Sequence, residues 1–249
     1  MNIGIFADSH ADCTYMDWPR NAPDIGPGWP ELLAKFYRVK NFAEGGSGLW
    51  FSFQRFLKYN QEFDYNVFIP SQYSRFTLHL PERGATLHVV PGFMTGDRLR
   101  KEHIRNRTVL DNQIIEAAAG YLDHLIDYDK DLYVAGLLTE QIHKVNPNTL
   151  IVHAFNNTNP DRLVLSDITI NELPLWGTTI EAVRNDHPDL CDLRKCHLSE
   201  ENNEMVFRKV RVAIKEKQQH LYFTRDDLMT PKKPFSAYFK KLEGRTGNV

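Results

Sequence analysis

The sequence predicts a three-layer α/β fold with a mainly parallel central sheet. Short apolar runs recur along the chain, and such runs are typical of strands buried on both faces of a parallel sheet. Segments with helical periodicity alternate with these runs, as expected for parallel strands joined by crossover helices. No internal repeat and no clear linker divides the 249 residues. We therefore expect one domain over residues 1–249, with insertions over about residues 73–146 and a C-terminal extension over about residues 218–249.

The first part of the chain carries three of the expected strands. The expected elements are a strand over residues 2–7, a helix over 31–39, a very short strand at 41–43, a helix over about 49–59 and a strand within 64–70. Trp50, Phe53 and Phe56 fall on one face of the helix over 49–59, so we expect all three in the core. Polar residues follow the first and third strands directly, and in open α/β sheets chemistry tends to lie at this edge.

The rest of the chain is expected to be mainly helical. The expected elements are a hairpin within residues 76–91, two long helices within 98–146 with a break near 128–131, a strand over 149–153, a helix from about 198, an edge strand over 220–223 and a basic amphipathic helix over about 234–242. Ser199 is expected to cap the helix that starts near residue 198, because Glu200 and Glu201 then offset the helix dipole in its first turn. Residues 162–170 fit neither a helix nor a strand clearly.

Composition excludes several classes of protein. With 42% hydrophobic and 25% charged residues, the chain is neither collagen, low-complexity disorder nor coiled coil. The formal net charge is -2 and neither sign forms a long block, which argues against a nucleic-acid partner. Three cysteines, Cys13, Cys191 and Cys196, are too few for a disulfide framework. No apolar run reaches the roughly 20 residues of a membrane helix and no signal-peptide pattern opens the chain, so we expect a cytoplasmic protein without a membrane partner.

Four segments together carry the residue types that acyl transfer needs. They are Asp8-Ser9-His10, the glycine cluster over residues 45–48, Ser71-Gln72, and the segment from Asp192 to His197. A serine hydroxyl becomes a good nucleophile when an imidazole takes its proton, and a carboxylate holds that imidazole in the useful tautomer. The oxyanion that forms needs preorganised N–H donors, which the backbone of Ser9 and Gly46 and the side-chain amide of Gln72 can supply.

These segments resemble, in the same order and across nearly the whole chain, the sequence blocks of the SGNH (GDSL-like) hydrolases. Residues 7–10 resemble the first block, 41–47 the glycine block, 71–72 the third block, and 197–203 with the preceding Asp192 the last block, especially as seen in phage and bacterial members. The resemblance implies a flavodoxin-like three-layer sandwich and a serine esterase that uses no metal or cofactor. It implies that Ser9 is the nucleophile, His197 the base and Gly46 an oxyanion donor, and we expect Asp192 to be the acid that orients His197. Asp8, Ser71 and Gln72 are further candidates for the oxyanion or substrate-binding site.

The sequence departs from the family pattern at three places. Gln72 stands where the third block has Asn, which makes the side chain one methylene longer. Arg194 occupies the position three residues before His197, where the acid usually lies; Asp192 lies five residues before it, and Asp189 is a second candidate. Ala7 replaces a common glycine of the first block, a small-for-small exchange that we expect to be tolerated.

Two other functions start from the same residues. Asp8-Ser9-His10 also resembles the Asp-x-His opening of binuclear metallophosphoesterases, in which Asp8 and His10 would bind metal. That family needs further motifs that are missing: no Asn-His or Gly-His dipeptide occurs, and Gly96-Asp97 follows no apolar strand. The departures at residues 72 and 194 instead favour a non-catalytic binding protein that keeps the fold with a weakened site.

Several residues have plainer interpretations. The glycine cluster lacks the Gly-Lys-Ser/Thr ending of a P-loop and can be an ordinary turn. Cys191 and Cys196 lie beside His197, but their spacing and the lack of a second Cys/His pair argue against zinc and favour idle thiols. The loops that would select a substrate carry no recognisable motif, so we expect a small-molecule or carbohydrate ester without naming its acyl or alcohol part. The sequence leaves the oligomeric state open.

Overall fold

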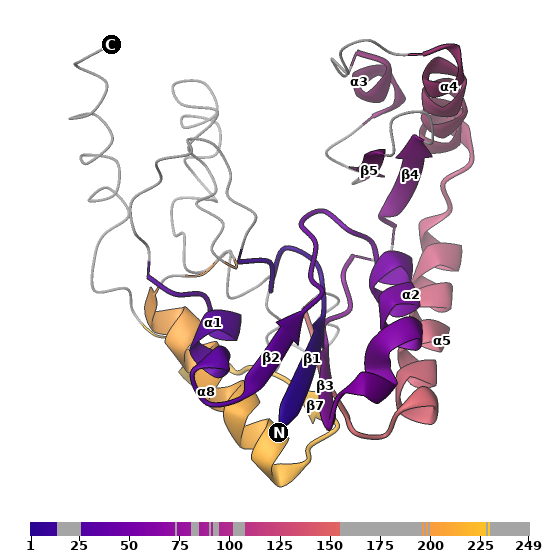
Figure 1. The fold of residues 1–249 in the computed structure, drawn as a ribbon. Coiled ribbons are helices and arrows are strands. Elements are labelled where there is room, and N and C mark those ends of the chain that lie inside the picture. The colour runs from indigo at the N-terminus through magenta and orange to yellow at the C-terminus, as the bar shows by residue number, and fades with distance from the viewer. Residues whose placement is uncertain are drawn as a thin grey trace, which may run out of the picture.

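The computed structural model describes residues 1–13, 26–72, 74–80, 85–89, 91, 95–101, 108–154, 196, 198, 200–227 and 229. In this part of the chain a five-stranded sheet lies between two layers of helices (Figure 1). The predicted α/β fold with a mainly parallel central sheet is confirmed.

The sheet has the strand order β2-β1-β3-β6-β7, and all four of its pairings are parallel. Its strands are β1 (Asn2–Phe6), β2 (Arg38–Asn41), β3 (Tyr65–Phe68), β6 (Thr149–Val152) and β7 (His220–Leu221). The chain leaves β1 toward one side to form β2 and then returns to the other side to form β3. Such a reversal of direction opens a crevice at the carboxyl ends of the strands, which is where α/β proteins of this kind bind ligands.

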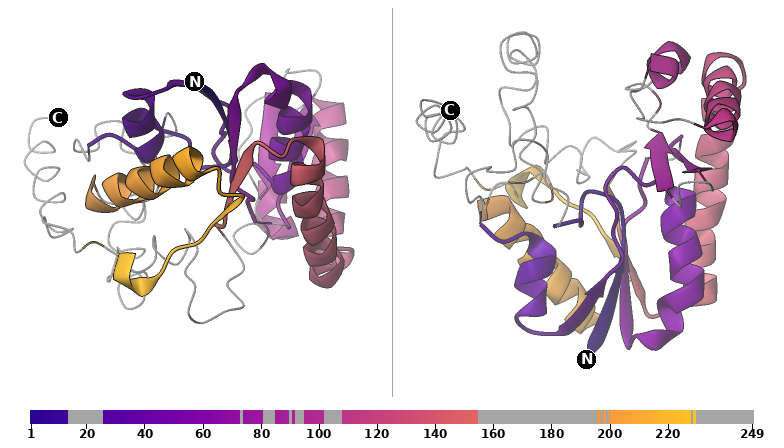
Figure 2. Two further views of the ribbon diagram at one scale, coloured as in Figure 1. Left: turned by 90° about the horizontal axis from the view of Figure 1, so that it is seen from below. Right: turned by 45° about the horizontal axis from the view of Figure 1, so that its top comes forward.

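Helices cover both faces of the sheet (Figures 1 and 2). On one face lie α1 (Trp29–Ala34) and α8 (Glu200–Glu216); on the other lie α2 (Leu49–Tyr59), which continues into the 3-10 turn η1 (Asn60–Glu62), and α5 (Tyr128–Val145). Successive strand residues point to opposite faces, so Ile5 packs in the α1/α8 core and Phe6 in the α2/α5 core. The buried strands therefore carry apolar side chains on both faces.

A small unit extends beyond the carboxyl edge of the sheet (Figure 1). It contains the antiparallel hairpin of β4 (Phe76–Leu80) and β5 (Ala85–Val89), followed by α3 (Gly96–Lys101) and α4 (Val109–His124). Val89, Leu99 and Ile115 form a separate apolar core between these elements. The predicted hairpin is thus confirmed, and it comes directly after the strand end that carries Ser71 and Gln72.

Three predicted features of the N-terminal half are wrong. The helix expected over residues 31–39 ends at Ala34, and residues 38–41 form β2 in place of a strand at 41–43. Val39 pairs with Ile3 along β1, so the sheet edge overrides the local helical pattern. Trp50 is 55% exposed, whereas Phe53 and Phe56 are buried as predicted.

The later elements follow the sequence with smaller changes. The region expected to hold two long helices also begins with the short α3, and the break between α4 and α5 lies at residues 125–127, just before the predicted position. The edge strand expected over 220–223 is the two-residue β7, which the 3-10 turn η4 (Arg225–Asp227) follows closely. The capping role of Ser199, residues 162–170 and the helix expected over 234–242 lie outside the described residues.

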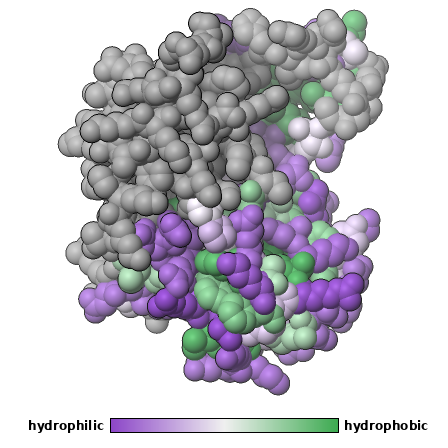
Figure 3. Space-filling model, turned by 60° about the vertical axis from the view of Figure 1, so that its left-hand side comes forward, coloured by the Kyte–Doolittle hydropathy of each residue, from purple (hydrophilic) through white to green (hydrophobic). Residues whose placement is uncertain are grey.

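The visible surface mixes residue types. Figure 3, which brings the α1 and α8 side forward, shows a small hydrophobic group bordered by hydrophilic residues on the described part of the surface. Phe36 and Val212 in this layer are about half exposed, and the Arg211 guanidinium lies 4.0 Å from the centre of the Phe36 ring. None of the helices in the described ranges is long and apolar enough to cross a membrane.

Candidate functional site

The chain makes a tight turn directly after β1, and Ser9 and His10 lie in its middle. The Asp8 carbonyl accepts hydrogen bonds from the amides of Ala11 (3.1 Å) and Asp12 (3.2 Å), which closes the turn. The Trp29 indole donates to the His10 carbonyl (2.8 Å), and the Asn41 side chain donates to the Ala11 carbonyl (2.7 Å). These bonds attach the turn to α1 and to the end of β2.

The Asp8 carboxylate stabilises the turn through hydrogen bonds. It is fully buried; its Oδ1 accepts from the amide and from Nδ1 of His10, both at 3.0 Å, and its Oδ2 accepts from Arg75 at 2.8 Å. Burial alone would raise the pKa of Asp8, but the contacts with His10 and the charge of Arg75 outweigh it and hold this pKa well below its usual range. Asp8 is therefore ionised throughout the physiological range, and its oxygens are directed at His10 and Arg75.

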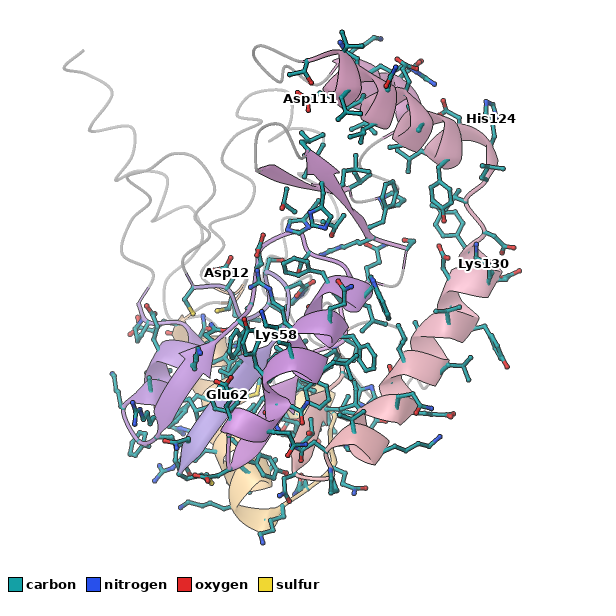
Figure 4. All side chains as sticks on the ribbon, turned by 45° about the vertical axis from the view of Figure 1, so that its right-hand side comes forward. Asp12, Lys58, Glu62, Asp111, His124 and Lys130 are labelled. Atoms are coloured by element: carbon teal, nitrogen blue, oxygen red, sulfur yellow. The ribbon has the colours of Figure 1, made fainter. Side chains whose placement is uncertain are left out.

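The glycine loop is joined to the same turn. Asp12 accepts a hydrogen bond from the Gly45 amide (2.9 Å), and the Glu44 amide donates to the Ala7 carbonyl (3.2 Å). Asp12 lies at the end of the sheet opposite Glu62 (Figure 4), as expected for a residue beyond the carboxyl ends of the strands. Gly46 has a φ of 79°, in the left-handed region that favours glycine. The loop therefore takes its shape from a position where a side chain would be strained.

The end of β3 brings the third predicted segment to this edge. Arg75 connects it to the turn, because its guanidinium donates to Asp8 at 2.8 Å and to Gln72 Oε1 at 3.4 Å. Ser71 is buried, and its hydroxyl has no hydrogen-bond partner among the residues that the structure describes. Three of the four predicted segments are therefore linked by hydrogen bonds at one edge of the sheet.

Several donors at this edge are unused. Within the described residues, no hydrogen bond involves the hydroxyl or the amide N–H of Ser9, the amide N–H of Gly46 or the side-chain N–H groups of Gln72. Their neighbours in the turn and the glycine loop are bonded. Buried polar groups are normally paired, so unused donors at a strand edge are available to a ligand.

A further group of side chains from the hairpin has no recognisable signal in the sequence. His88 Nε2 lies 2.9 Å from Glu44 Oε1, and Thr77 Oγ1 lies 3.0 Å from His88 Nδ1. A carboxylate only accepts, so Nε2 donates a proton to Glu44. Arg55 binds the other Glu44 oxygen at 2.7 Å. His88 thus fastens the hairpin to the glycine loop, next to Gly46.

The fourth predicted segment is described only in part. His197, Asp192, Asp189 and Arg194 lie outside the described residues. Cys196 is described, and its sulfur lies 3.3 Å from that of Cys13, which follows the Ser9 turn. Asn203 on α8 connects Leu198, whose carbonyl it binds at 3.0 Å, with the Trp29 amide at 2.9 Å. The residues on either side of His197 in the sequence are therefore held beside α1 and the turn.

A cavity of about 500 Å³ opens between α5 and the strand ends. Its lining includes Leu49, Ser71, Leu132, His143, His153 and His220. His143 Nε2 donates to the Thr149 carbonyl (3.0 Å), and His153 Nε2 lies 3.1 Å from His220 Nδ1. Burial, and then the neighbouring His143, lowers the pKa of His220. The α5 side of the cavity mixes apolar residues with Thr139, Glu140 and Lys144, and Ser71 is part of the lining.

The metal-binding alternative finds no support at Asp8 and His10. These two side chains bind each other, and Arg75 places a positive charge on the second Asp8 oxygen. No group of three or more His, Cys, Asp or Glu side chains suited to a metal ion occurs in the part of the chain that the structure describes.

Comparisons with known proteins leave the family a prediction. The chain matches no known family profile and no curated protein. Among solved structures it is similar to the lipase/acylhydrolase from Enterococcus faecalis, with 15% sequence identity, coverage of 86% of this chain and 96% of that chain, and a TM-score of 0.33. A likeness of this size assigns neither a reaction nor a substrate to the chain.

Proposed function

We propose that the protein is a metal-independent serine esterase of the SGNH type that cleaves a small acyl or acetyl ester, on a carbohydrate or another small alcohol. The observation that carries this proposal is the unused hydroxyl and amide of Ser9, on a turn hydrogen-bonded to the glycine loop and, through Asp8 and Arg75, to Gln72. A strand-end serine that only stabilised its turn would direct its hydroxyl at a backbone group.

In the proposed reaction Ser9 Oγ attacks the ester carbonyl carbon, and His197 takes the hydroxyl proton. Asp192 holds the imidazole in the tautomer that accepts this proton. The tetrahedral oxyanion receives hydrogen bonds from the amides of Ser9 and Gly46 and from the Gln72 side chain, and each such donor contributes about 2.7–4 kcal/mol in the transition state. His197 then returns the proton to the leaving alcohol, and water hydrolyses the acyl-enzyme by the same path.

Arg75 supports the oxyanion role of Gln72. Its guanidinium donates to Gln72 Oε1, which leaves the N–H groups of the same amide directed away from Arg75. The longer side chain at this position therefore comes with a partner that orients it. Cys196 supports the role of His197, since it holds the adjacent position against the segment that follows Ser9.

Covalent labelling of the serine tests the proposal. A fluorophosphonate is expected to label Ser9 in the folded protein, and Ser9→Ala is expected to abolish labelling and to lower p-nitrophenyl acetate turnover by about 10³-fold or more. His197→Ala is expected to cause a loss of similar size, because both residues act in the same proton transfer.

Ser52→Ala is the matched control. The Ser52 hydroxyl is also buried near the end of β1, but it donates to the Ala7 carbonyl at 3.2 Å. Its loss is expected to cost about 1 kcal/mol of stability and to leave labelling intact. Folded wild-type protein that never reacts with the fluorophosphonate would indicate the non-catalytic binding protein, and turnover that survives both Ser9→Ala and His197→Ala would exclude the proposed mechanism.

A further inference from the structure

Two cysteines that are 183 positions apart in the sequence are in contact. Cys13 Sγ lies 3.3 Å from Cys196 Sγ, and neither is in a disulfide. Cys13 is half-buried at the end of the turn that carries Ser9, whereas Cys196 is fully buried just before α8. The contact therefore joins two segments that only the tertiary structure brings together.

The surroundings of the two sulfurs are shaped to hold them. A Cβ atom at Gly28 would lie 2.6 Å from Cys13 Sγ and 2.9 Å from Cys196 Sγ, so both sulfurs occupy the space that a side chain at residue 28 would need. Cys196 has a φ of 60°, which is uncommon for a residue with a side chain and persists where the surrounding structure enforces it. The Cys13 thiol is also within 3.7 Å of the Ala11 carbonyl, which keeps it on the turn.

We propose that Cys13 and Cys196 are a redox-active dithiol that closes to an intramolecular disulfide when it meets hydrogen peroxide. Cys13 sulfur attacks one peroxide oxygen; the O–O bond breaks, water leaves, and Cys13 becomes a sulfenic acid. Cys196 sulfur then attacks the Cys13 sulfur, an S–S bond forms, and the sulfenic oxygen leaves as a second water molecule. Two electrons pass from the two sulfurs to the peroxide, and both thiol protons end in water.

The two thiols have different roles in this reaction. Burial, and then contact with Cys13, raises the pKa of the Cys196 thiol, so Cys196 is the poorer first nucleophile. Cys13 is the more exposed of the two and meets the oxidant first. Contact between the sulfurs then makes the second step fast, because a held pair reacts at a high effective concentration.

Disulfide formation changes the geometry next to the proposed base. The sulfurs must approach from 3.3 Å to the S–S bond length of about 2.05 Å, a closure of about 1.2 Å that is shared between Cys13 on the Ser9 turn and Cys196, the residue preceding His197. A displacement of this size in a catalytic site can cost about 10²-fold in rate. We therefore expect the disulfide to lower esterase activity. This expectation rests on the proposed function, whereas formation of the disulfide does not.

Thiol titration and mass spectrometry of the full-length protein test the proposal. After full reduction and brief exposure to hydrogen peroxide, the denatured protein is expected to retain one of its three titratable thiols and to have lost about 2 Da. A non-reducing peptide map is expected to contain Cys13 linked to Cys196, and reductant should restore all three thiols. Cys13→Ser is expected to prevent the mass loss, and Cys191→Ser, the matched control, to leave it unchanged.

Three results would overturn the proposal: a linkage through Cys191, oxidation of Cys13 to sulfinic acid without a cross-link, or three thiols that survive the treatment. Gly28→Ala, which places a methyl group too close to both sulfurs for either to stay in place, is expected to slow cross-linking by at least about tenfold, because it disturbs the contact that makes the second step fast. Ser9→Ala is expected to cross-link at the wild-type rate, so failure of the esterase proposal would leave this result unaffected.

Discussion

Replacing Asp8 by Asn tests whether a buried carboxylate organises the turn that carries Ser9. Asp8 accepts two hydrogen bonds from His10 and one from Arg75, and the Arg75 side chain is only 11% exposed. An Asn side chain keeps one acceptor oxygen but places an N–H group where Arg75 or His10 donates. The variant therefore removes the negative charge beside a nearly buried guanidinium and at least one of the three hydrogen bonds that Asp8 accepts.

The expected loss in the free energy of unfolding follows from these contacts. Charge-assisted hydrogen bonds contribute about 1.5–3 kcal/mol each, and breaking a buried ion pair from one side costs about 3–5 kcal/mol. We expect Asp8→Asn to lower the free energy of unfolding by about 3–5 kcal/mol at pH 7, out of a typical total of about 5–15 kcal/mol. For a chain of 249 residues this corresponds to a fall in Tm of roughly 6–20 °C.

Urea unfolding followed by circular dichroism measures the effect, with Asp64→Asn as the control. Asp64 is exposed and accepts one hydrogen bond, from the Asn2 amide at 2.7 Å, so its loss should cost less than about 1 kcal/mol. Combining Asp8→Asn with Arg75→Gln removes both charges, and we expect a coupling energy of about 2 kcal/mol between the two changes.

The pH dependence has a definite sign. The pKa of Asp8 is lowered in the folded protein, so its contribution is complete above the unfolded value of about 3.9 and is lost as pH falls from there toward the folded pKa. The stability difference between wild type and Asp8→Asn should stay constant from about pH 8 to pH 5 and shrink below about pH 4. A loss under about 1 kcal/mol, or a double mutant whose effects simply add, would refute the organising role of this carboxylate.

Three further predictions concern single residues. Gly46→Ala is expected to cost about 1–2 kcal/mol in urea unfolding because of its φ of 79°, whereas Gly120→Ala, in α4 with no heavy atom within 4 Å of the new Cβ, is expected to stabilise by about 0.5–1 kcal/mol; equal effects would contradict the strain at Gly46. Phe56→Ala is expected to cost about 3–5 kcal/mol in the same assay because Phe56 is fully buried, and Trp50→Ala, at a 55% exposed site on the same helix, less than about 1 kcal/mol; the reverse order would place the core on the wrong face of α2. His88→Ala is expected to speed amide hydrogen exchange in β4 and β5, since it removes the hydrogen bonds that fasten the hairpin to the glycine loop, and unchanged exchange would rule out that attachment.

The order of the elements could be predicted because their sequence patterns are local. Apolar runs of four or five residues predicted β1, β3 and β6, and the helical spacing of Phe53 and Phe56 predicted α2. The helix expected over residues 31–39 failed for a non-local reason, since residues 38–41 pair with β1 along the sheet. The prediction that Trp50 is buried was wrong because α2 buries a narrower face than its run of aromatic residues indicated.

The candidate site could likewise be predicted only in part. The residue types at the strand ends, Ser9, Gly46 and Gln72 among them, could be chosen from the sequence because the carboxyl ends of parallel strands share one edge. The sequence contained no signal that Arg75 connects Asp8 with Gln72 or that His88 binds Glu44, since each contact depends on how the hairpin folds back over the sheet.

The sequence by itself determined the α/β class, the helical or extended character of most segments and the chemical types of the residues at the edge of the sheet, because each of these follows from local periodicity and composition. Only the tertiary structure decided which of those residues meet. Asp8 binds Arg75 across 67 positions of sequence, and Cys13 contacts Cys196 across 183. Such pairs form when strand pairing and the burial of apolar side chains bring distant segments together, and no pattern within either segment encodes its partner.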